Sequence, residues 1–156
     1  MKIRKAEEKD CPRLLELLQD IGKFHQQGRP DIFRAGAQKY SLTDLLEILK
    51  DSAKPIFVVV DETDLVQGYA MCQLKKQLDD PVFLRAKVLY LDDLEVSENL
   101  RGTGAGKALM AACKDFAQIA GCDRIELSVW EFPGSALEFY RKQGYSTQHR
   151  YMELKL

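Results

Sequence analysis

Residues Val88 to Leu109 read VLYLDDLEVSENLRGTGAGKAL, and the rest of the chain can be interpreted around them. The stretch begins as a strand, passes through a short polar connection and enters a helix at three alternating glycines, Gly102, Gly104 and Gly106. A glycine has no Cβ, so the backbone there can approach a ligand closely. The free N–H groups and the positive dipole end at a helix start attract anions. The turn is therefore predicted to bind a phosphate.

Three phosphate-binding motifs share this composition, and spacing distinguishes them. The P-loop pattern G-x-x-x-x-G-K-[S/T] fails because Arg101 stands at its first glycine and Ala108 at its magnesium-binding hydroxyl. The dinucleotide pattern G-x-G-x-x-G fails because Lys107 stands at its third glycine. An NTP-binding protein is therefore disfavoured. The remaining pattern is [Q/R]-x-x-G-x-[G/A], which Arg101, Gly104 and Gly106 satisfy.

This pattern resembles the signature of the GCN5-related N-acetyltransferases (GNAT), which binds the pyrophosphate of acetyl-CoA. A second block, ALEFYRKQGY at residues 136–145, is similar to that family's A-x-x-x-Y-x-x-x-G-[F/Y] block, in the same order and spacing. The stretch YLDDLEVSENLRGTGAG looks most like the diamine (spermidine/spermine) acetyltransferase branch. The clear resemblance covers about residues 56–145. It implies acetyl transfer from acetyl-CoA to a small, cationic primary amine in a direct ternary complex, with no metal.

The resemblance also implies a fold, and the residue patterns agree with it. We expect one three-layer α/β domain over residues 1–156, of the acyl-CoA N-acyltransferase type, with a mixed sheet of six to seven strands whose central strands splay. Strand, helix and strand across residues 83–130 predict a βαβ unit with parallel strands. The expected helices are 11–21, 42–52, 104–120 and 135–142, and the expected strands are 1–6, 56–62, 68–75, 83–96, 124–130 and a terminal hairpin or strand pair in 145–156.

Capping signals mark where these helices begin and end. Asp10 is expected to cap the first helix, and Gly22 to end it. Two capping boxes are predicted to open later helices, one formed by Ser41 with Asp44 and the other by Ser135 with Glu138.

Between Gly22 and Tyr40 lies an irregular segment that contains His25, Asp31 and Phe33. Long irregular connections in compact domains are often functional, so these three residues are candidates for the wall of the acceptor site. The alternative is a surface loop held by its phenylalanines. His25 is interpreted as positioning this loop rather than as a base.

Acetyl transfer needs a neutral amine, and three carboxylates could produce one. A primary amine has a pKa near ~10 and is protonated at pH 7, so a base must remove its proton, directly or through water. Asp92 and Asp93 are adjacent on a strand and point to opposite faces unless the strand bulges. Glu95 shares the face of Asp93. Each carboxylate could instead be solvated or structural.

The resemblance gives the remaining catalytic roles. In the family this strand bulges beside the acyl group, and a freed backbone amide, here that of Leu94 or its neighbour, polarises the thioester carbonyl. Tyr140 matches the tyrosine that protonates the leaving thiolate, and a phenol can do so in a dry site. Its alternative role is packing on the helix face beside Ala136 and Leu137.

The cofactor site is predicted along the end of the strand, the glycine turn and the second block. One residue departs from the family pattern, because Pro133 stands where an asparagine often holds the pantetheine arm or the acetyl end; Ser135 is near enough to substitute. The alternative function that this departure favours is a CoA-binding sensor or interaction module without turnover. The candidate cofactor residues are Leu94, Glu95, Val96, Arg101, Gly102, Thr103, Gly104, Ala105, Gly106, Lys107, Ser135 and Ala136.

Composition limits the partners. The 23 basic and 24 acidic residues give a net charge of −1, which favours neither nucleic acid nor an anionic membrane. No secretory segment or membrane span is expected, which predicts a cytoplasmic protein. A homodimer is an expectation from the family. Four cysteines without a C-x-x-C pair are expected to be reduced and mostly buried: Cys11, Cys72, Cys113 and Cys122.

Overall fold

The computed structural model describes residues 1–78 and 80–156, and a five-stranded sheet in the order β1-β2-β3-β4-β5 runs through that part of the chain. Neighbouring strands are antiparallel except β4 and β5, which are parallel as expected. The predicted mixed sheet is confirmed, but the predicted six or seven strands are wrong. The strands are β1 (Lys2–Lys5), β2 (Ile56–Val60), β3 (Val66–Gln77), β4 (Ala86–Val96) and β5 (Arg124–Leu127).

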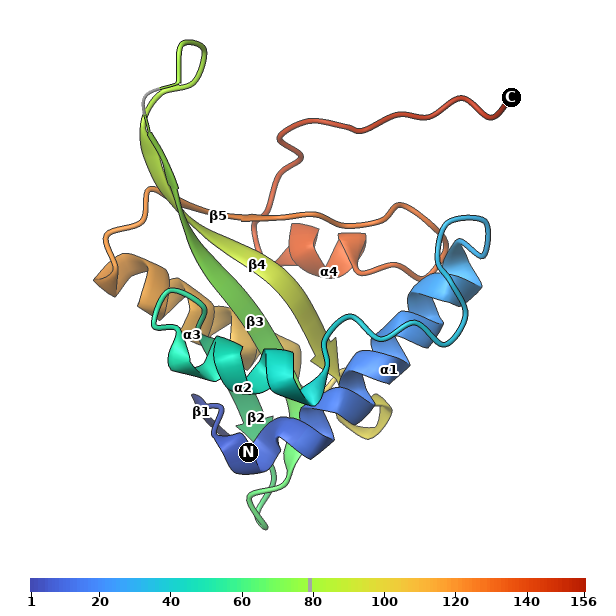
Figure 1. Ribbon diagram of the computed structural model, residues 1–156, viewed down its shortest axis with the longest axis vertical. Helices are drawn as coiled ribbons and strands as arrows, with labels where there is room; N and C mark the ends of the chain where they lie inside the picture. Colours follow the sequence, from blue (N-terminus) through green and yellow to red (C-terminus); the bar gives the residue numbers. More distant parts are fainter. Residues whose placement is uncertain (79) are drawn as a thin grey trace.

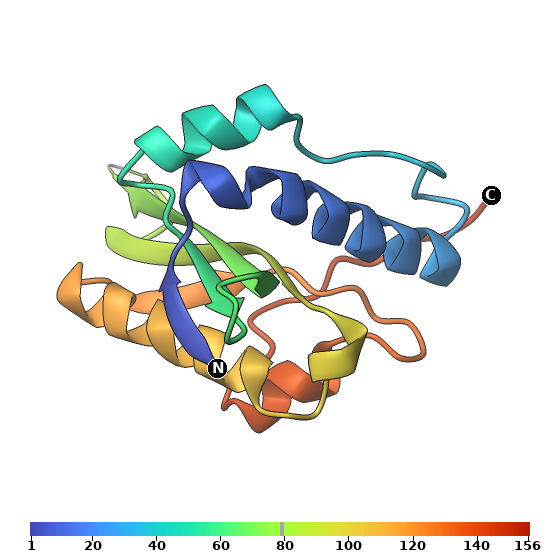
Figure 2. The same ribbon diagram turned by 90° about the horizontal axis from the view of Figure 1, so that it is seen from below.

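Helices cover both faces of the sheet and make three layers (Figure 1). Figure 2 shows α1 (Cys11–Gly28) and α2 (Leu42–Lys50) on one face, with α3 (Ala105–Ile119) and α4 (Leu137–Lys142) on the other. Short 3₁₀ turns precede α1 at Glu8–Asp10 and α3 at Glu98–Leu100. Among the described residues no helix is long and apolar enough to cross a bilayer.

Each face of the sheet has its own hydrophobic core, and β2 contributes to both. Val58 packs toward α1 and α2, whereas Phe57 and Val59 pack toward α3. All five residues of β2 are buried, as the β-branched run predicted for a central strand. Burying both faces of this strand provides much of the hydrophobic stabilisation that holds the two helical layers onto the sheet.

The first helix is longer than the sequence indicated. Gly22 was expected to end it, but α1 continues to Gly28. A mid-helix glycine costs about 1 kcal/mol relative to alanine, which tertiary packing can offset. A Cβ on Gly22 would lie 3.3 Å from the Ala37 carbonyl oxygen, and the Phe132 ring packs directly on Gly28. His25 therefore projects from a helix, and the irregular connection begins only at residue 29.

Of the three predicted caps, only one forms as expected. Ser41 and Asp44 make the reciprocal capping box at the start of α2. The Asp10 carboxylate caps no amide of α1, because it accepts hydrogen bonds from Arg4 and from the Glu7 amide instead.

The second predicted capping box, of Ser135 with Glu138, does not form either. α4 begins at Leu137, with Ala136 at its N-cap and no side-chain cap bond. The helix therefore starts without the Ser135 hydroxyl satisfying one of its first amides.

The C-terminal segment forms no strand within the described residues, so the predicted terminal hairpin or strand pair is wrong. Residues 146–156 run away from the sheet beyond α4 (Figure 1). Ion pairs from Arg29 to Glu153 and from Asp31 to Lys155 tie the tail to the turn after α1. Alternating side chains suit a strand only if a sheet edge is available to pair with it, and here the tail pairs with none.

The cysteines follow the expectation. Cys11, Cys72 and Cys113 are buried and Cys122 is partly exposed, and all four are free thiols.

Candidate active site

A β-bulge in β4 shapes the centre of the candidate site. Met71 of β3 pairs with Asp93, but the next residue, Cys72, pairs with Leu91, so Asp92 is the extra residue. Leu91 before the bulge and Leu94 after it both pack on the α3 side. The side chains of Asp92 and Asp93 therefore both lie on the α1 side of the sheet. In a regular strand two adjacent carboxylates would point to opposite faces, and the bulge brings them to the same one.

Side chains from the connection between α1 and α2 hold both carboxylates. The Tyr40 hydroxyl donates a hydrogen bond of 2.6 Å to Asp92 Oδ2. The Lys39 Nζ lies 3.0 Å from Asp92 Oδ2, 3.5 Å from Asp93 Oδ2 and 3.1 Å from the Asp92 carbonyl oxygen. The Asp92 and Asp93 side chains are only 16% and 10% exposed, so Lys39 faces carboxylates that water scarcely reaches.

Burial makes Asp93 a stronger base than an ordinary aspartate. Loss of solvation raises its pKa, and the neighbouring Asp92 charge adds to the increase. The Lys39 charge and the Leu94 amide partly oppose this effect. The pKa of Glu95 is raised for the same main reason, although its pairing with Arg101 opposes the shift.

Tyr140 lies on the other face of the sheet, in the core beneath α3. Its ring is 8% exposed and contacts Phe139 and Tyr145, with ring centroids 5.2 and 5.8 Å away. Burial raises the pKa of the Tyr140 phenol well above its usual range, and the Asp93 charge raises it further. The phenol is therefore protonated at neutral pH and has a proton to donate. Tyr140 therefore packs in the core, and its role as the acid stays a prediction.

The glycine turn leaves a row of backbone amides without partners among the described residues. Gly102 and Gly104 adopt positive φ angles of 78° and 93°, which favour glycine. The Arg101 and Thr103 amides bond to carbonyl oxygens of the preceding turn. Within residues 1–78 and 80–156, no hydrogen bond is made by the amides of Gly102, Gly104, Ala105, Gly106 and Lys107.

Gly106 also has a packing role that the sequence did not indicate. A Cβ at this position would lie 3.2 Å from the Phe139 ring, so the glycine lets α4 approach the start of α3.

The side chains of Arg101 and Glu95 bind one another rather than face the turn. Arg101 donates to Glu95 Oε1 at 2.8 Å and to the Val96 carbonyl at 3.2 Å. Both residues were predicted on the cofactor side. The Glu95 side chain lies 7% exposed on the α1 side of the sheet, since its strand partner is Tyr69 of the α1-side core. By strand alternation its backbone groups face β3, so Glu95 directs neither its side chain nor its backbone toward the glycine turn.

Beyond the bulge, one edge of β4 has backbone groups that no strand of the described chain covers. β5 pairs only with Val88 to Leu91. The Ser97 amide donates to the Gln67 carbonyl on β3, so by alternation the backbone groups of Leu94 and Val96 point to the opposite edge. Leu94 and Val96 therefore lie beside an open edge of β4, at the place where the central strands were expected to splay.

Ser135 and Ala136 lie on the loop that leads into α4, next to a cavity of about 370 Å³. The Ser135 amide donates to the Phe132 carbonyl, and Pro133 and Ser135 both line the cavity. The loop is anchored to α1, because the Phe132 ring lies on Gly28 and 5.4 Å from the Phe24 ring.

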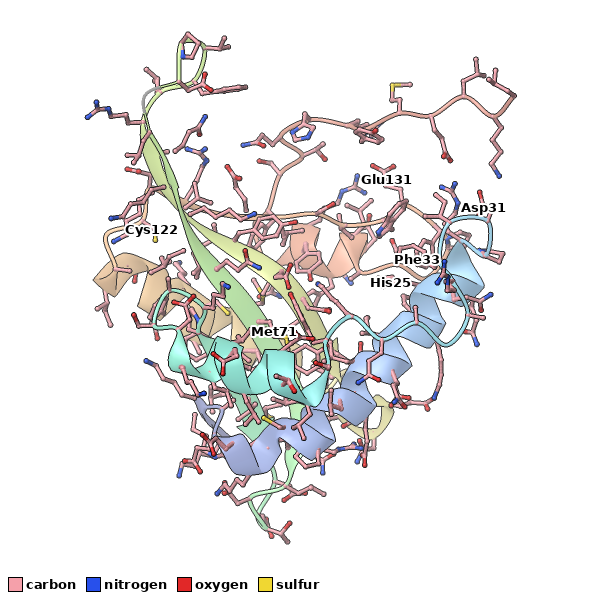
Figure 3. All side chains as sticks on the ribbon, viewed as in Figure 1. His25, Asp31, Phe33, Met71, Cys122 and Glu131 are labelled. Carbon is pink, nitrogen blue, oxygen red and sulfur yellow. The ribbon has the colours of Figure 1, made fainter. Side chains whose placement is uncertain are left out.

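Of the three predicted acceptor residues, the structure brings two together. Figure 3 shows His25 and Phe33 side by side near the end of α1, where their rings stack at 5.1 Å. Burial, and secondarily the Lys39 charge, lower the pKa of His25. Asp31 lies further out at the turn, where Arg29 and Lys155 bind its carboxylate.

Sequence reasoning missed three residues of this region. Lys39 and Tyr40 were grouped with an irregular loop, and nothing in their spacing predicts contacts with a strand more than 50 positions later. Tyr69 is fully buried on the same face, and its hydroxyl has no hydrogen-bond partner in the described chain. Burial, with the Asp93 and Glu95 charges adding to it, raises the pKa of Tyr69 well above its usual range.

Comparison of the sequence with known protein families gives one match. Residues 4–145 match the profile of the Acetyltransferase (GNAT) family. The chain belongs to the GNAT family. Like other members, it is an acyltransferase, and the family uses acetyl-CoA as its co-substrate.

Relatives of known activity and structure agree with this assignment. The thialysine N-epsilon-acetyltransferase of Bos taurus is 23% identical over 152 residues, which span 91% of this chain and 82% of that protein. The streptothricin acetyltransferase of Streptomyces lavendulae is 34% identical over 58 residues, which span 37% of this chain and 31% of that enzyme. A solved tetramutant of the BH1408 protein from Bacillus halodurans is 29% identical and superposes with a TM-score of 0.94 over 100% of both chains. The GNAT fold expected from the sequence is confirmed.

The residues present fit the family's co-substrate. Cβ atoms built on Gly102 and Gly104 meet nothing within 4 Å, so the space beside the free amides is open. Free N–H groups at a helix start suit a diphosphate, and the uncovered backbone groups of Leu94 and Val96 suit the amides of a pantetheine arm. Among the described residues no group of three or more His, Cys, Asp or Glu side chains is placed to hold a metal ion.

Replacing Gly104 with alanine is expected to weaken acetyl-CoA binding roughly tenfold, which corresponds to about 1.4 kcal/mol. A non-glycine residue in the left-handed region costs about 1–2 kcal/mol, and relaxing that strain rotates the amides away from the phosphates. Calorimetry on Gly104→Ala measures the affinity. Gly121→Ala is the matched control, because Gly121 has a φ of 67° at the opposite end of α3 with open space around it. It should lose similar stability and no affinity; equal affinity loss in both variants would contradict the assignment.

Proposed function

We propose that this GNAT protein transfers the acetyl group of acetyl-CoA to a primary amine of a small, cationic acceptor through a direct ternary complex. The β-bulge at Asp92 carries the proposal. It turns two carboxylates toward the connection between α1 and α2, while the free amides of the turn and the Tyr140 phenol lie along the other side. A base and an acid on opposite sides of β4 suit a reaction that removes one proton and supplies another.

Asp93 is proposed as the base and Asp92 as the residue that orients the amine. The raised pKa of Asp93 makes its carboxylate a better proton acceptor at neutral pH. Asp92 is fixed by the Tyr40 hydroxyl, and the oxygen that accepts this hydrogen bond also lies 3.0 Å from an ammonium, that of Lys39. An incoming amine would exchange its water shell for these two carboxylates and give its proton to Asp93, directly or through water.

The acyl end of the co-substrate is proposed to lie at the open edge of β4. Acetyl-CoA supplies a thioester whose carbonyl carbon the amine attacks. The Leu94 amide points to that edge and is proposed to donate a hydrogen bond to the carbonyl oxygen, stabilising the charge that develops there. Tyr140 is proposed to protonate the departing thiolate.

A cationic acceptor is supported by the charges around the bulge and by the names of the relatives. The site already holds one primary ammonium, that of Lys39, between Asp92 and Asp93. The relative from Bos taurus is named for the epsilon nitrogen of thialysine, and that from Streptomyces lavendulae for streptothricin. The resemblance of the motif stretch to the diamine branch points the same way. We propose His25 and Phe33 for the wall of the acceptor site, with Asp31 serving the C-terminal tail.

A homodimer is proposed from the exposed tail. The side chains of Tyr151, Met152, Leu154 and Leu156 are each at least 85% exposed, and β5 lies at an edge of the sheet. Apolar side chains exposed in a row commonly mark an interface, and an uncovered strand edge can pair with a second chain. Analytical ultracentrifugation tests this: a dimer is expected, and a monomer at every concentration would contradict it. A cytoplasmic location stays a prediction from the sequence.

The experiment that tests the function is CoA release from acetyl-CoA in the presence of an amine panel. Diamines, lysine analogues with a side-chain amine, neutral amino acids and aminoglycosides should be compared at equal concentration. Cationic primary amines are expected to give the highest kcat/KM. The absence of turnover across the panel, together with no acetyl-CoA binding by calorimetry, would refute the proposal. Binding without turnover would favour the sensor alternative.

A further inference from the structure

Lys39 lies at the position that the proposed function assigns to the acceptor amine. The Lys39 Nζ lies 3.1 Å from the carbonyl oxygen of Asp92, the bulge residue, and 3.0 Å from its carboxylate. It also lies 3.5 Å from the Asp93 carboxylate, which is the base of the proposed function. These are the contacts that an external ammonium would make before it lost its proton.

The position of Lys39 along β4 also matches the acyl end of the co-substrate. The Leu94 amide, proposed to bind the thioester carbonyl, follows Asp92 by two residues and lies close enough to affect the Asp93 carboxylate. An amine held by Asp92 and Asp93 would therefore lie at the part of β4 to which the proposed function assigns the thioester carbonyl. A lysine side chain is a primary amine on a flexible stem, so it can advance or withdraw without movement of the backbone.

The surroundings of Lys39 differ from those of a structural ion pair. Its side chain is 41% exposed, whereas both carboxylates are nearly buried. It belongs to the irregular connection between α1 and α2, and its Nζ lies 5.5 Å from the centroid of the Tyr40 ring. If Lys39 leaves, Asp92 keeps the hydrogen bond from the Tyr40 hydroxyl. The site thus stays formed while its cation exchanges.

We propose that Lys39 occupies the acceptor position and is itself acetylated on Nζ when acetyl-CoA is bound and no external amine is present. The inference rests on the proposed function, because it uses the same base, acid and thioester. The Lys39 ammonium gives a proton to Asp93, and the neutral Nζ forms a bond to the acetyl carbon. The carbon–sulfur bond of the thioester breaks, and the thiolate takes a proton from Tyr140. The second proton of the acylated nitrogen leaves through water and restores the Tyr140 phenol, and Asp93 returns its proton to solvent. The products are N-acetylated Lys39 and CoA.

Mass spectrometry on the full chain incubated with acetyl-CoA alone tests this. Lys50 and Lys54 are internal controls in the same molecule, because each is exposed and paired with a nearby carboxylate outside the site. Lys39 is expected to gain an acetyl group far faster than either control. The rate should not depend on protein concentration, since the reaction is intramolecular, and a cationic amine that the enzyme turns over should slow it. In Asp93→Asn the rate should fall by roughly 10² or more, the usual effect of losing a general base.

Three results would overturn the inference. Lys39 could be acetylated no faster than Lys50 and Lys54 while the enzyme acetylates external amines, which would refute the inference and leave the proposed function intact. Lys39 could be modified at a rate proportional to protein concentration, which would mean that it reacts in another molecule's site. An enzyme that neither binds acetyl-CoA nor modifies any amine would refute both. Lys39→Arg, which keeps the charge, verifies that the mapped modification is at this residue.

Discussion

Tyr140→Phe is expected to lower kcat by roughly 10²–10⁴, the range for loss of a general acid, with the Kd for acetyl-CoA unchanged. The substitution removes only the hydroxyl, and the ring keeps its contacts with Phe139 and Tyr145. Burial and the Asp93 charge raise the pKa of the phenol, so it stays protonated throughout the neutral range. Steady-state kinetics and calorimetry on the same preparation measure the two quantities.

Tyr145→Phe is the matched control for this variant. Tyr145 is a neighbouring tyrosine whose ring centroid is 5.8 Å from that of Tyr140, and burial raises its pKa to about 12. The Tyr145→Phe substitution also removes one phenol hydroxyl from the same core, and the variant should keep the kcat of the natural protein. If Tyr140→Phe also kept kcat, the acid would have to be another group or water. If neither the natural protein nor the variant turned over any amine, the CoA-binding sensor would be the better account.

Asp93→Asn is expected to reduce kcat by roughly 10²–10⁴ while leaving the fold at least as stable at neutral pH. The stability expectation follows from the sign of the pKa shift. Burial raises the pKa of Asp93 in the folded state, so its ionised form disfavours folding as the pH rises through that pKa. Asparagine removes that cost, and Lys39 retains its pairing with Asp92. Kinetics and thermal unfolding together separate lost catalysis from lost folding.

The pH profile gives a second readout for Asp93. The natural enzyme should lose activity as the pH falls through the raised pKa of Asp93, because a protonated carboxyl cannot accept the amine's proton. In Asp93→Asn that acid limb should disappear. Asp92→Asn should instead raise the KM of a cationic acceptor more than it lowers kcat. If Asp92→Asn removed the acid limb and Asp93→Asn did not, the two roles would have to be exchanged.

The parts of the fold that short sequence patterns encode were predicted well. Gly102 and Gly104 adopt the positive φ angles that favour glycine, and the backbone amides of the same turn are the groups expected to bind phosphate. Both features depend on adjacent residues, so the sequence alone predicts them. The same holds for the run at β2. The helical periodicity placed α3 correctly and includes the buried Leu109 and Cys113, but Ile119 at its end is exposed. The bulge at Asp92 came from the resemblance to a family, since a strand pattern alone does not say where its partner slips.

The remaining differences come from contacts between distant parts of the chain. α1 continues past Gly22 because two distant segments pack on its second half. The Ala37 carbonyl lies against Gly22, and the Phe132 ring lies on Gly28. A lone lysine in an irregular segment carries no signal for the carboxylates it binds, yet Lys39 meets Asp92 across 53 positions. The C-terminal segment alternates like a strand, but alternation does not provide the partner edge that a strand requires.

A crystal structure of the protein with coenzyme A tests the central claim most directly. The account predicts that the diphosphate accepts hydrogen bonds from the amides of Gly102 and of residues 104–106, and that the thiol end lies at the open edge of β4 beside Leu94. A diphosphate bound anywhere else, with these amides turned to solvent or bonded within the protein, would contradict it.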